Sequence, residues 1–125
     1  MGKVLLSIKP EFAEKIFNGE KSFEFRKVVF KRLAIHTIVV YASWPVQRVI
    51  GEFEIDEILS LHPDELWRQT KKASGISQRF FQEYFSDKVI GHAIKVKATK
   101  RYSRPRHLHE LIDGPPPQSF RYLPS

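Results

Sequence analysis

Hydrophobic side chains along this chain follow two different periods, and the change of period separates strands from helices. A short apolar run over 4–8 predicts a strand. Residues 11–18 then carry apolar side chains four positions apart, with Pro10 suited to a first helical turn, which predicts an amphipathic helix. Gly19 follows, and glycine supplies the left-handed residue that ends many helices. The chain therefore opens with a strand, a helix and a turn.

The stretch after this turn alternates with the period of a strand. Phe23 and Phe25 are expected to face a core, whereas Glu24 and Arg26 share the opposite face and Lys21 lies beside them in the turn. Composition alone favours an exposed hairpin, because charge runs are usually solvated and an exposed ion pair stabilises by less than about 1 kcal/mol. The dense charge beside two aromatic side chains makes this stretch the first candidate site.

Further along, the same patterns predict more strands and helices. Gly51, early in the longest apolar-polar alternation, predicts a bulge that bends a strand. Aromatic side chains pair four positions apart after Ser77, and we interpret this stripe as core rather than as a stacking surface. Residues 113–117 form a stiff proline-rich connector. The expected strands are 37–41, 48–59, 89–99 and 119–123, and the expected helices are 63–73 and the one that Ser77 caps.

Length and composition limit the chemistry. The 125 residues, 42% of them hydrophobic, suffice for one core, so one domain is expected over 1–125. The absence of cysteine excludes disulfides, thiolate metal sites and thiol catalysis. His107 and His109 have no third ligand placed beside them, so no metal is expected. No Gly-rich phosphate loop is present, and no cofactor is expected. The apolar run between Lys3 and Lys9 is too short for a signal peptide or a membrane span, and we expect a cytoplasmic protein with no membrane partner.

The net charge of +7 favours polyanionic partners, because phosphate contacts release condensed counterions. The strongest basic cluster follows the strand expected at 89–99. It could hold the phosphates of a bound strand or form a solvated face. The cluster surrounds Tyr102 and comprises Lys100, Arg101, Arg104 and Arg106.

Two further positions leave alternatives open. Trp44 and Pro45 end the strand expected at 37–41, so Trp44 could stack on a base or cap the core. Lys9 lies where the first strand meets the first helix and could line a cleft or remain solvated. Both positions lie where small β-proteins often place ligands.

The pattern Gly-x-Lys-x-x-Glu-x-Arg, present here as Gly19, Lys21, Glu24 and Arg26, resembles the signature of the ASCH domains, which are related to the PUA RNA-binding modules. Other stretches of the chain resemble small prokaryotic and phage ASCH proteins in the expected order. These stretches are 5–10, 41–43, 51–54 and 117–122.

The resemblance implies an α+β fold. It implies a PUA-like, mixed and mostly antiparallel β-barrel of about five or six strands with about three helices at its rim. In that family the cleft lies between the barrel and the helix before the signature. The residues expected to bind the ligand are Lys9, Lys21, Glu24, Arg26, Tyr41, Ser43, Trp44, Arg48, Ser119 and Tyr122.

The resemblance also implies a function. We expect a regulatory or RNA-processing protein that binds single-stranded RNA or a nucleotide, acts as a monomer or weak dimer, and has no assigned protein partner. The alternative is a hydrolase of the same fold, in which Lys21 and Glu24 would be catalytic: a metal-independent ribonuclease, or an amidohydrolase on acylated cytidine. The amidohydrolase pattern has a threonine where Glu24 stands and a glutamate that aligns with Ser74, which favours the ribonuclease.

Overall fold

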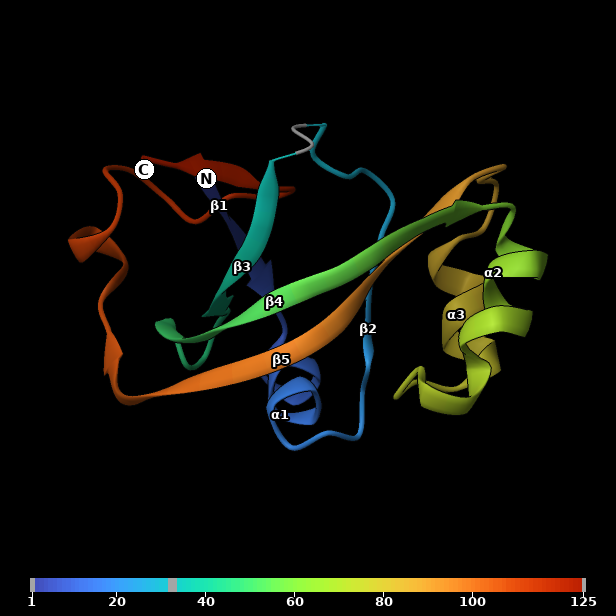
Figure 1. The fold of residues 1–125 in the computed structure, drawn as a ribbon, viewed down its shortest axis with the longest axis horizontal. Coiled ribbons are helices and arrows are strands. Elements are labelled where there is room, and N and C mark those ends of the chain that lie inside the picture. The colour runs from blue at the N-terminus through green and yellow to red at the C-terminus, as the bar shows by residue number, and fades with distance from the viewer. Residues whose placement is uncertain (1, 32–33, 125) are drawn as a thin grey trace.

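One mixed β-sheet runs through the molecule (Figure 1). The computed structural model describes residues 2–31 and 34–124. The strands within these residues are β1 (Gly2–Ile8), β2 (Phe23–Arg26), β3 (Ile35–Ala42), β4 (Arg48–Leu61), β5 (Gly91–Arg106) and β6 (Arg121–Leu123). They form a six-stranded sheet in the order β2-β5-β4-β3-β1-β6. β1 runs parallel to β3, and the other neighbouring strands are antiparallel.

The helices lie at two places along the sheet. Helix α1 (Pro10–Phe17) follows β1 directly, and helices α2 (Pro63–Thr70) and α3 (Gln78–Tyr84) connect β4 to β5. In Figure 1, α2 and α3 lie together at one end of the long β4–β5 hairpin, away from the two chain ends. No helix within the described residues is long and apolar enough to cross a membrane. Two short 3-10 turns complete the fold, η1 (Lys71–Ala73) and η2 (Leu108–Glu110).

The buried side chains form three clusters. Successive residues of a strand point to opposite faces, so β1 contributes Val4, Leu6 and Ile8 to the cluster that α1 covers and Leu5 to the cluster on the other face. The third cluster lies beneath α2 and α3, where Phe25 contacts α3. The sheet is therefore buried on both faces over part of its length, and α1 and α3 meet beside β2, where Phe12 contacts Phe80.

Most predicted elements are confirmed, with ends that shift by a few residues. The register shift between Val49 and Gly51 confirms the predicted bulge. The helix expected over 63–73 ends at Thr70 and continues as η1. β5 extends to Arg106, well past the expected end at residue 99, because its polar second half pairs with the start of β4. The hydrophobic pattern cannot predict this part of the strand, because its side chains are polar and only the hydrogen bonds to β4 keep it extended.

The predicted fold class is confirmed as α+β with a mixed sheet and three α-helices within residues 2–31 and 34–124. The expected barrel is not shown, since the described ladders do not join β2 to β6.

Candidate functional site

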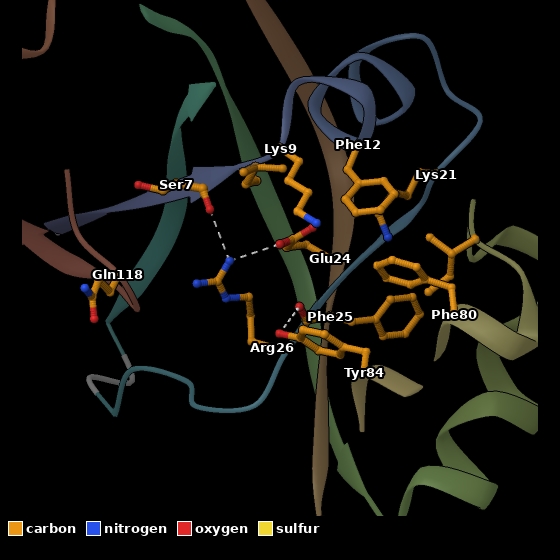
Figure 2. Close-up of a pocket in the computed structure, with 12 residues that line it drawn as sticks. Ser7, Lys9, Phe12, Lys21, Glu24, Phe25, Arg26, Phe80, Tyr84 and Gln118 are labelled. Carbon is orange, nitrogen blue, oxygen red and sulfur yellow. Dashed lines mark hydrogen bonds and ion pairs between the residues drawn. The ribbon is translucent and has the colours of Figure 1, made fainter. Parts of the chain in front are cut away.

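A pocket of about 260 Å³ lies between the end of β1, helix α1, strand β2 and helix α3 (Figure 2). Its walls differ in character. One part is charged or polar and the other is aromatic, an arrangement typical of sites that hold a flat polar ligand. The polar side chains are Ser7, Lys9, Lys21, Glu24, Arg26 and Gln118, and the aromatic ones are Phe12, Phe25, Phe80 and Tyr84.

Lys21 is buried in this pocket with its side chain only 2% exposed. The left-handed Gly19 (φ 88°) follows the end of α1 and turns the chain into the stretch that carries Lys21, which lines the pocket. Its ammonium donates a hydrogen bond to the Ser74 carbonyl oxygen at 3.1 Å. The same nitrogen lies 4.5 Å from the centroid of Phe25 and 5.7 Å from that of Phe12. Two aromatic faces and one carbonyl therefore surround the charge.

Burial lowers the pKa of Lys21 to about 8 because desolvation disfavours the ammonium; the carboxylate of Glu24 opposes this effect and the ammonium of Lys15 adds to it. A lysine of this kind exists in both protonation states near neutral pH. It can therefore exchange a proton with a bound ligand, which an ordinary surface lysine does far less readily.

The loop between η1 and α3 is shaped around Lys21. Gly75 adopts a left-handed conformation (φ 70°), and a Cβ at this position would lie 2.6 Å from the Lys21 Cβ. Lys15 donates a hydrogen bond to the Gly75 carbonyl at 3.1 Å, and the Ser22 amide donates to Ala73 at 2.9 Å. These contacts hold the Ser74 carbonyl against the ammonium.

Arg26 fastens three segments together. Its guanidinium forms an ion pair with Glu24 at 3.2 Å and donates hydrogen bonds to the carbonyls of Ser7 at 3.3 Å and Ser119 at 2.7 Å. Ser7 in turn donates its hydroxyl proton to the Pro117 carbonyl at 2.8 Å. Arg26 thus holds the segment over 117–119 against the end of β1, and this segment places Gln118 at the pocket.

Helix α3 supplies an aromatic wall. Phe80 and Tyr84 stack with their centroids 6.5 Å apart, and Phe80 meets Phe12 of α1 edge to face at 5.4 Å. The Tyr84 hydroxyl donates to the Phe25 carbonyl at 3.2 Å, and burial raises the pKa of this phenol. Lys9 lies across the opening with its nitrogen 5.9 Å from the Phe80 centroid.

Four of the predicted site residues line the pocket, namely Lys9, Lys21, Glu24 and Arg26. Glu24 is 6% exposed, so this charged face is enclosed rather than solvated, contrary to the interpretation that composition alone favoured. The reason is that α1 and the 117–119 segment cover the face of β2 on which it lies.

The other predicted residues lie elsewhere. Tyr41, 4% exposed, packs with Leu5 and Val49 in the cluster on the opposite face of the sheet. Ser119 contributes its carbonyl to Arg26, and Tyr122 accepts a hydrogen bond from the Lys31 amide at 3.1 Å. The remaining three lie outside the pocket lining, Ser43 and Trp44 in the turn after β3 and Arg48 at the start of β4.

The sequence did not identify several pocket residues. The aromatic stripe after Ser77 was assigned to the core, yet only Phe81 and Phe85 are buried there, while Phe80 and Tyr84 face the pocket. The sequence does carry a signal of this, because the two i,i+4 pairs begin at adjacent residues and so lie on different sides of the helix, with Phe85 just past its end. No three His, Asp or Glu side chains gather into a metal-binding group within the described chain.

Comparisons with known proteins identify relatives along nearly the whole chain. The ASCH domain model matches residues 6–100. An ASCH domain-containing ribonuclease of Zymomonas mobilis is 28% identical over 125 residues, covering 97% of this chain and 84% of that protein. The crystal structure of ASCH from Zymomonas mobilis superposes with a TM-score of 0.89 at 28% identity, covering 98% of this chain and 87% of that one.

Longer relatives contain the same region as a part. The chain is 31% identical to a Ureaplasma parvum protein named ATP synthase subunit alpha and 28% identical to one named large ribosomal subunit protein uL22. These matches cover 96% of this chain but only 15% and 39% of those proteins. The family match, the superposition and the filled signature around Lys21 agree, and the chain belongs to the ASCH domain family.

Proposed function

We propose that this protein is a ribonuclease that cleaves single-stranded RNA in the pocket around Lys21. The observation that carries the proposal is the buried ammonium of Lys21, whose pKa burial lowers to about 8, in the same pocket as the carboxylate of Glu24. An acid and a base of this kind, in one cleft, suit proton transfer at neutral pH. The relative named as a ribonuclease supports catalysis over the simple binding that the sequence favoured.

The cleavage would proceed by attack within the RNA. Glu24 accepts the proton of a ribose 2′-hydroxyl, whose oxygen attacks the adjacent phosphorus. The bond from phosphorus to the 5′-oxygen breaks, and Lys21 gives its proton to that oxygen. The products are a 2′,3′-cyclic phosphate and a free 5′-hydroxyl, and the enzyme regains its protonation states through solvent. Lys9, at the opening, faces the negative charge of the phosphate.

The shape of the pocket supports a single-stranded substrate. A base must leave its stack to enter a closed cleft, and RNA proteins commonly receive such bases on aromatic side chains. The stacked rings of Phe80 and Tyr84 offer this surface, and Gln118 offers both a donor and an acceptor to a base edge.

The pocket suits an amidohydrolase less well than a ribonuclease. The partner of the Lys21 ammonium is the backbone carbonyl of Ser74, which cannot take a proton as the aligned glutamate carboxylate would. Regulatory RNA binding without cleavage is the second candidate, and the net charge of +7 favours it. Cleavage of bound RNA distinguishes the ribonuclease from this binding protein.

The test is cleavage of a short single-stranded RNA, with a 2′-deoxy strand of the same sequence as an uncleavable control. The natural protein should release products ending in a 2′,3′-cyclic phosphate. Lys21→Met and Glu24→Gln should each lower the rate at least about 100-fold. Lys72→Met, at an exposed lysine of η1, should leave it unchanged. Retention of RNA without products would favour the binding protein, and equal rates in Lys21→Met would remove Lys21 from the mechanism.

A further inference from the structure

Trp44 stands out from the fold because 76% of its side chain is exposed. The core-capping alternative left open by the sequence is therefore wrong. The turn that carries it is well ordered by hydrogen bonds, since the amides of Val46 and Gln47 both donate to the Ser43 carbonyl, at 3.1 and 3.4 Å. Burial of apolar area, which explains most tryptophans in folded proteins, does not explain this one.

The turn with Trp44 adjoins the pocket. β1 and β3 are parallel neighbours that end together, with Ile8 opposite Ala42. Beyond this pair, the amide of Ser43 donates to the Ile8 carbonyl at 3.0 Å. The next residue of each segment is then Lys9 on one side and Trp44 on the other, and Lys9 lies at the pocket opening. The turn is therefore bonded directly to Ile8, a residue of the pocket lining.

Basic side chains also lie on the β4 side of the turn, away from Lys9. Arg48 opens β4 directly after it and is exposed. The start of β4 pairs with the basic end of β5, where Val49 lies opposite Arg106 and Glu52 opposite Lys100. Figure 1 shows the β3–β4 turn and the bent end of β5 at the same end of the sheet. The exposed tryptophan thus lies between a polar pocket and a cationic strand end.

We propose that Trp44 is a stacking platform for a second base of an RNA strand whose neighbouring nucleotide occupies the pocket. The inference rests on the proposed function and narrows its substrate. The ligand is then a strand of several nucleotides, whose phosphates continue toward the basic end of β5, and not a free nucleotide. Single-strand binders combine stacking platforms with cationic tracks in this way, and the net charge of +7 complements the strand.

Fluorescence reports on this site directly, because the chain has only two tryptophans. Trp67 packs against Phe81, with centroids 5.0 Å apart, and its replacement in Trp67→Phe leaves Trp44 as the single fluorophore. A 2′-O-methyl hexauridylate, which lacks the attacking hydroxyl, should quench Trp44 in this variant, whereas uridine 5′-monophosphate should not. The reciprocal variant Trp44→Phe, which reports on Trp67, should show little quenching by the hexamer.

Affinity gives a second measurement. Trp44→Ala should weaken binding of the hexamer by about 5- to 150-fold, the range that loss of one base stack produces, and Trp44→Phe should retain most of the affinity. Binding of the mononucleotide, which fills only the pocket, should be the same in all three proteins. Unchanged hexamer affinity in Trp44→Ala would overturn the inference.

The outcomes separate the two proposals. Cleavage of RNA without quenching of Trp44 would overturn the platform and leave the ribonuclease intact. If the 2′-O-methyl hexamer quenches Trp44 but unmodified RNA is not cleaved, the platform is supported and the ribonuclease proposal is wrong. A change of Trp44 fluorescence with protein concentration alone would show that a second copy of the chain covers this side chain, which would also overturn the platform.

Discussion

Lys21 and Ser74, 53 positions apart in the sequence, meet through a hydrogen bond of 3.1 Å from the ammonium to the backbone carbonyl. The bond joins the turn after α1 to the loop before α3. A carbonyl can only accept, so it favours the protonated lysine, while burial favours the neutral form. The pKa of Lys21 therefore depends on whether the loop around Gly75 keeps the Ser74 carbonyl within hydrogen-bond distance of the ammonium.

Replacement of Lys21 by methionine should change how stability depends on pH. The folded protein holds the pKa of Lys21 at about 8 through burial, against the ordinary value of 10.5 in the unfolded chain. Between these values the unfolded chain binds the proton that the folded protein has released, so the free energy of unfolding rises with pH. Relative to Lys21→Met, the natural protein should gain on the order of 3 kcal/mol across this window.

Urea denaturation of both proteins at a series of pH values from about 7 to about 10.5 measures this difference. The comparison cancels the other titrating groups. Parallel profiles would show that Lys21 titrates in the folded protein as it does in the unfolded chain.

The charges beside Lys21 should move its pKa in opposite directions. Burial is the largest cause of the lowered pKa, Glu24 opposes it, and Lys15 adds to it. Glu24→Gln should therefore lower the pKa of Lys21 further, and Lys15→Met should raise it. Titration of the Lys21 side chain by NMR measures both shifts. Glu20→Gln, at an exposed acid near the same turn, is the matched control and should have little effect; shifts of the same sign in the first two variants would contradict the assignment.

Replacement of Arg26 by lysine should loosen the C-terminal wall of the pocket. An ammonium cannot reproduce the spread of donors that reaches Glu24, Ser7 and Ser119. We expect a loss of about 1–3 kcal/mol in the free energy of unfolding, since at least one buried partner is left without its hydrogen bond. Amide hydrogen exchange over 118–121 should become faster.

The matched control for Arg26→Lys is Arg48→Lys. Arg48 is exposed and donates to the carbonyl of its neighbour Gln47 at 2.9 Å, so its replacement should change stability by no more than about 0.5 kcal/mol. Equal effects of the two substitutions would show that Arg26 does not fasten the segment.

Alanine substitutions at two glycines distinguish the cost of backbone strain from the cost of a steric clash. Gly19 and Gly75 both adopt positive φ, and alanine at either position carries a strain of about 1 kcal/mol. A Cβ at Gly19 meets nothing within 4 Å, whereas one at Gly75 lies 2.6 Å from the Lys21 Cβ. Gly75→Ala should therefore destabilise the protein by about 1–3 kcal/mol more than Gly19→Ala.

Thermal or urea unfolding of the two alanine variants measures this difference, and the pKa of Lys21 in each shows whether the loop has moved. Equal losses of stability would mean that the loop around Gly75 moves enough to relieve the clash with Lys21, which contradicts the prediction.

Local pattern was enough to predict much of the fold and the centre of the site. The alternation in this stretch placed Phe23 and Phe25 in a core and Glu24 with Arg26 at a site, and both are observed, although Phe25 lines the pocket as well. The glycine before Lys21 indicated the turn that positions it. These features depend on neighbours within a few residues, which a periodic pattern records.

The rest of the site depends on contacts between distant segments. Nothing near Lys21 in sequence indicates that the Ser74 carbonyl meets it, and nothing near Arg26 indicates Ser119. Tyr41 illustrates the same limit, because its position at a strand end left its face undetermined, and the register with β4 places it away from the pocket. The positions of these side chains are set by contacts between segments that are distant in sequence.

The bonds from Arg26 to Ser7 and Ser119 span 19 and 93 positions of the chain. Forming the longer contact closes a loop of 93 positions, and the chain entropy lost in that closure offsets part of what the hydrogen bond contributes. The wall that carries Gln118 therefore depends on segments at both ends of the chain being folded together. An unfolded chain exposes Lys21 to water without the enclosure that lowers its pKa, so the lowered pKa is a property of the folded protein alone.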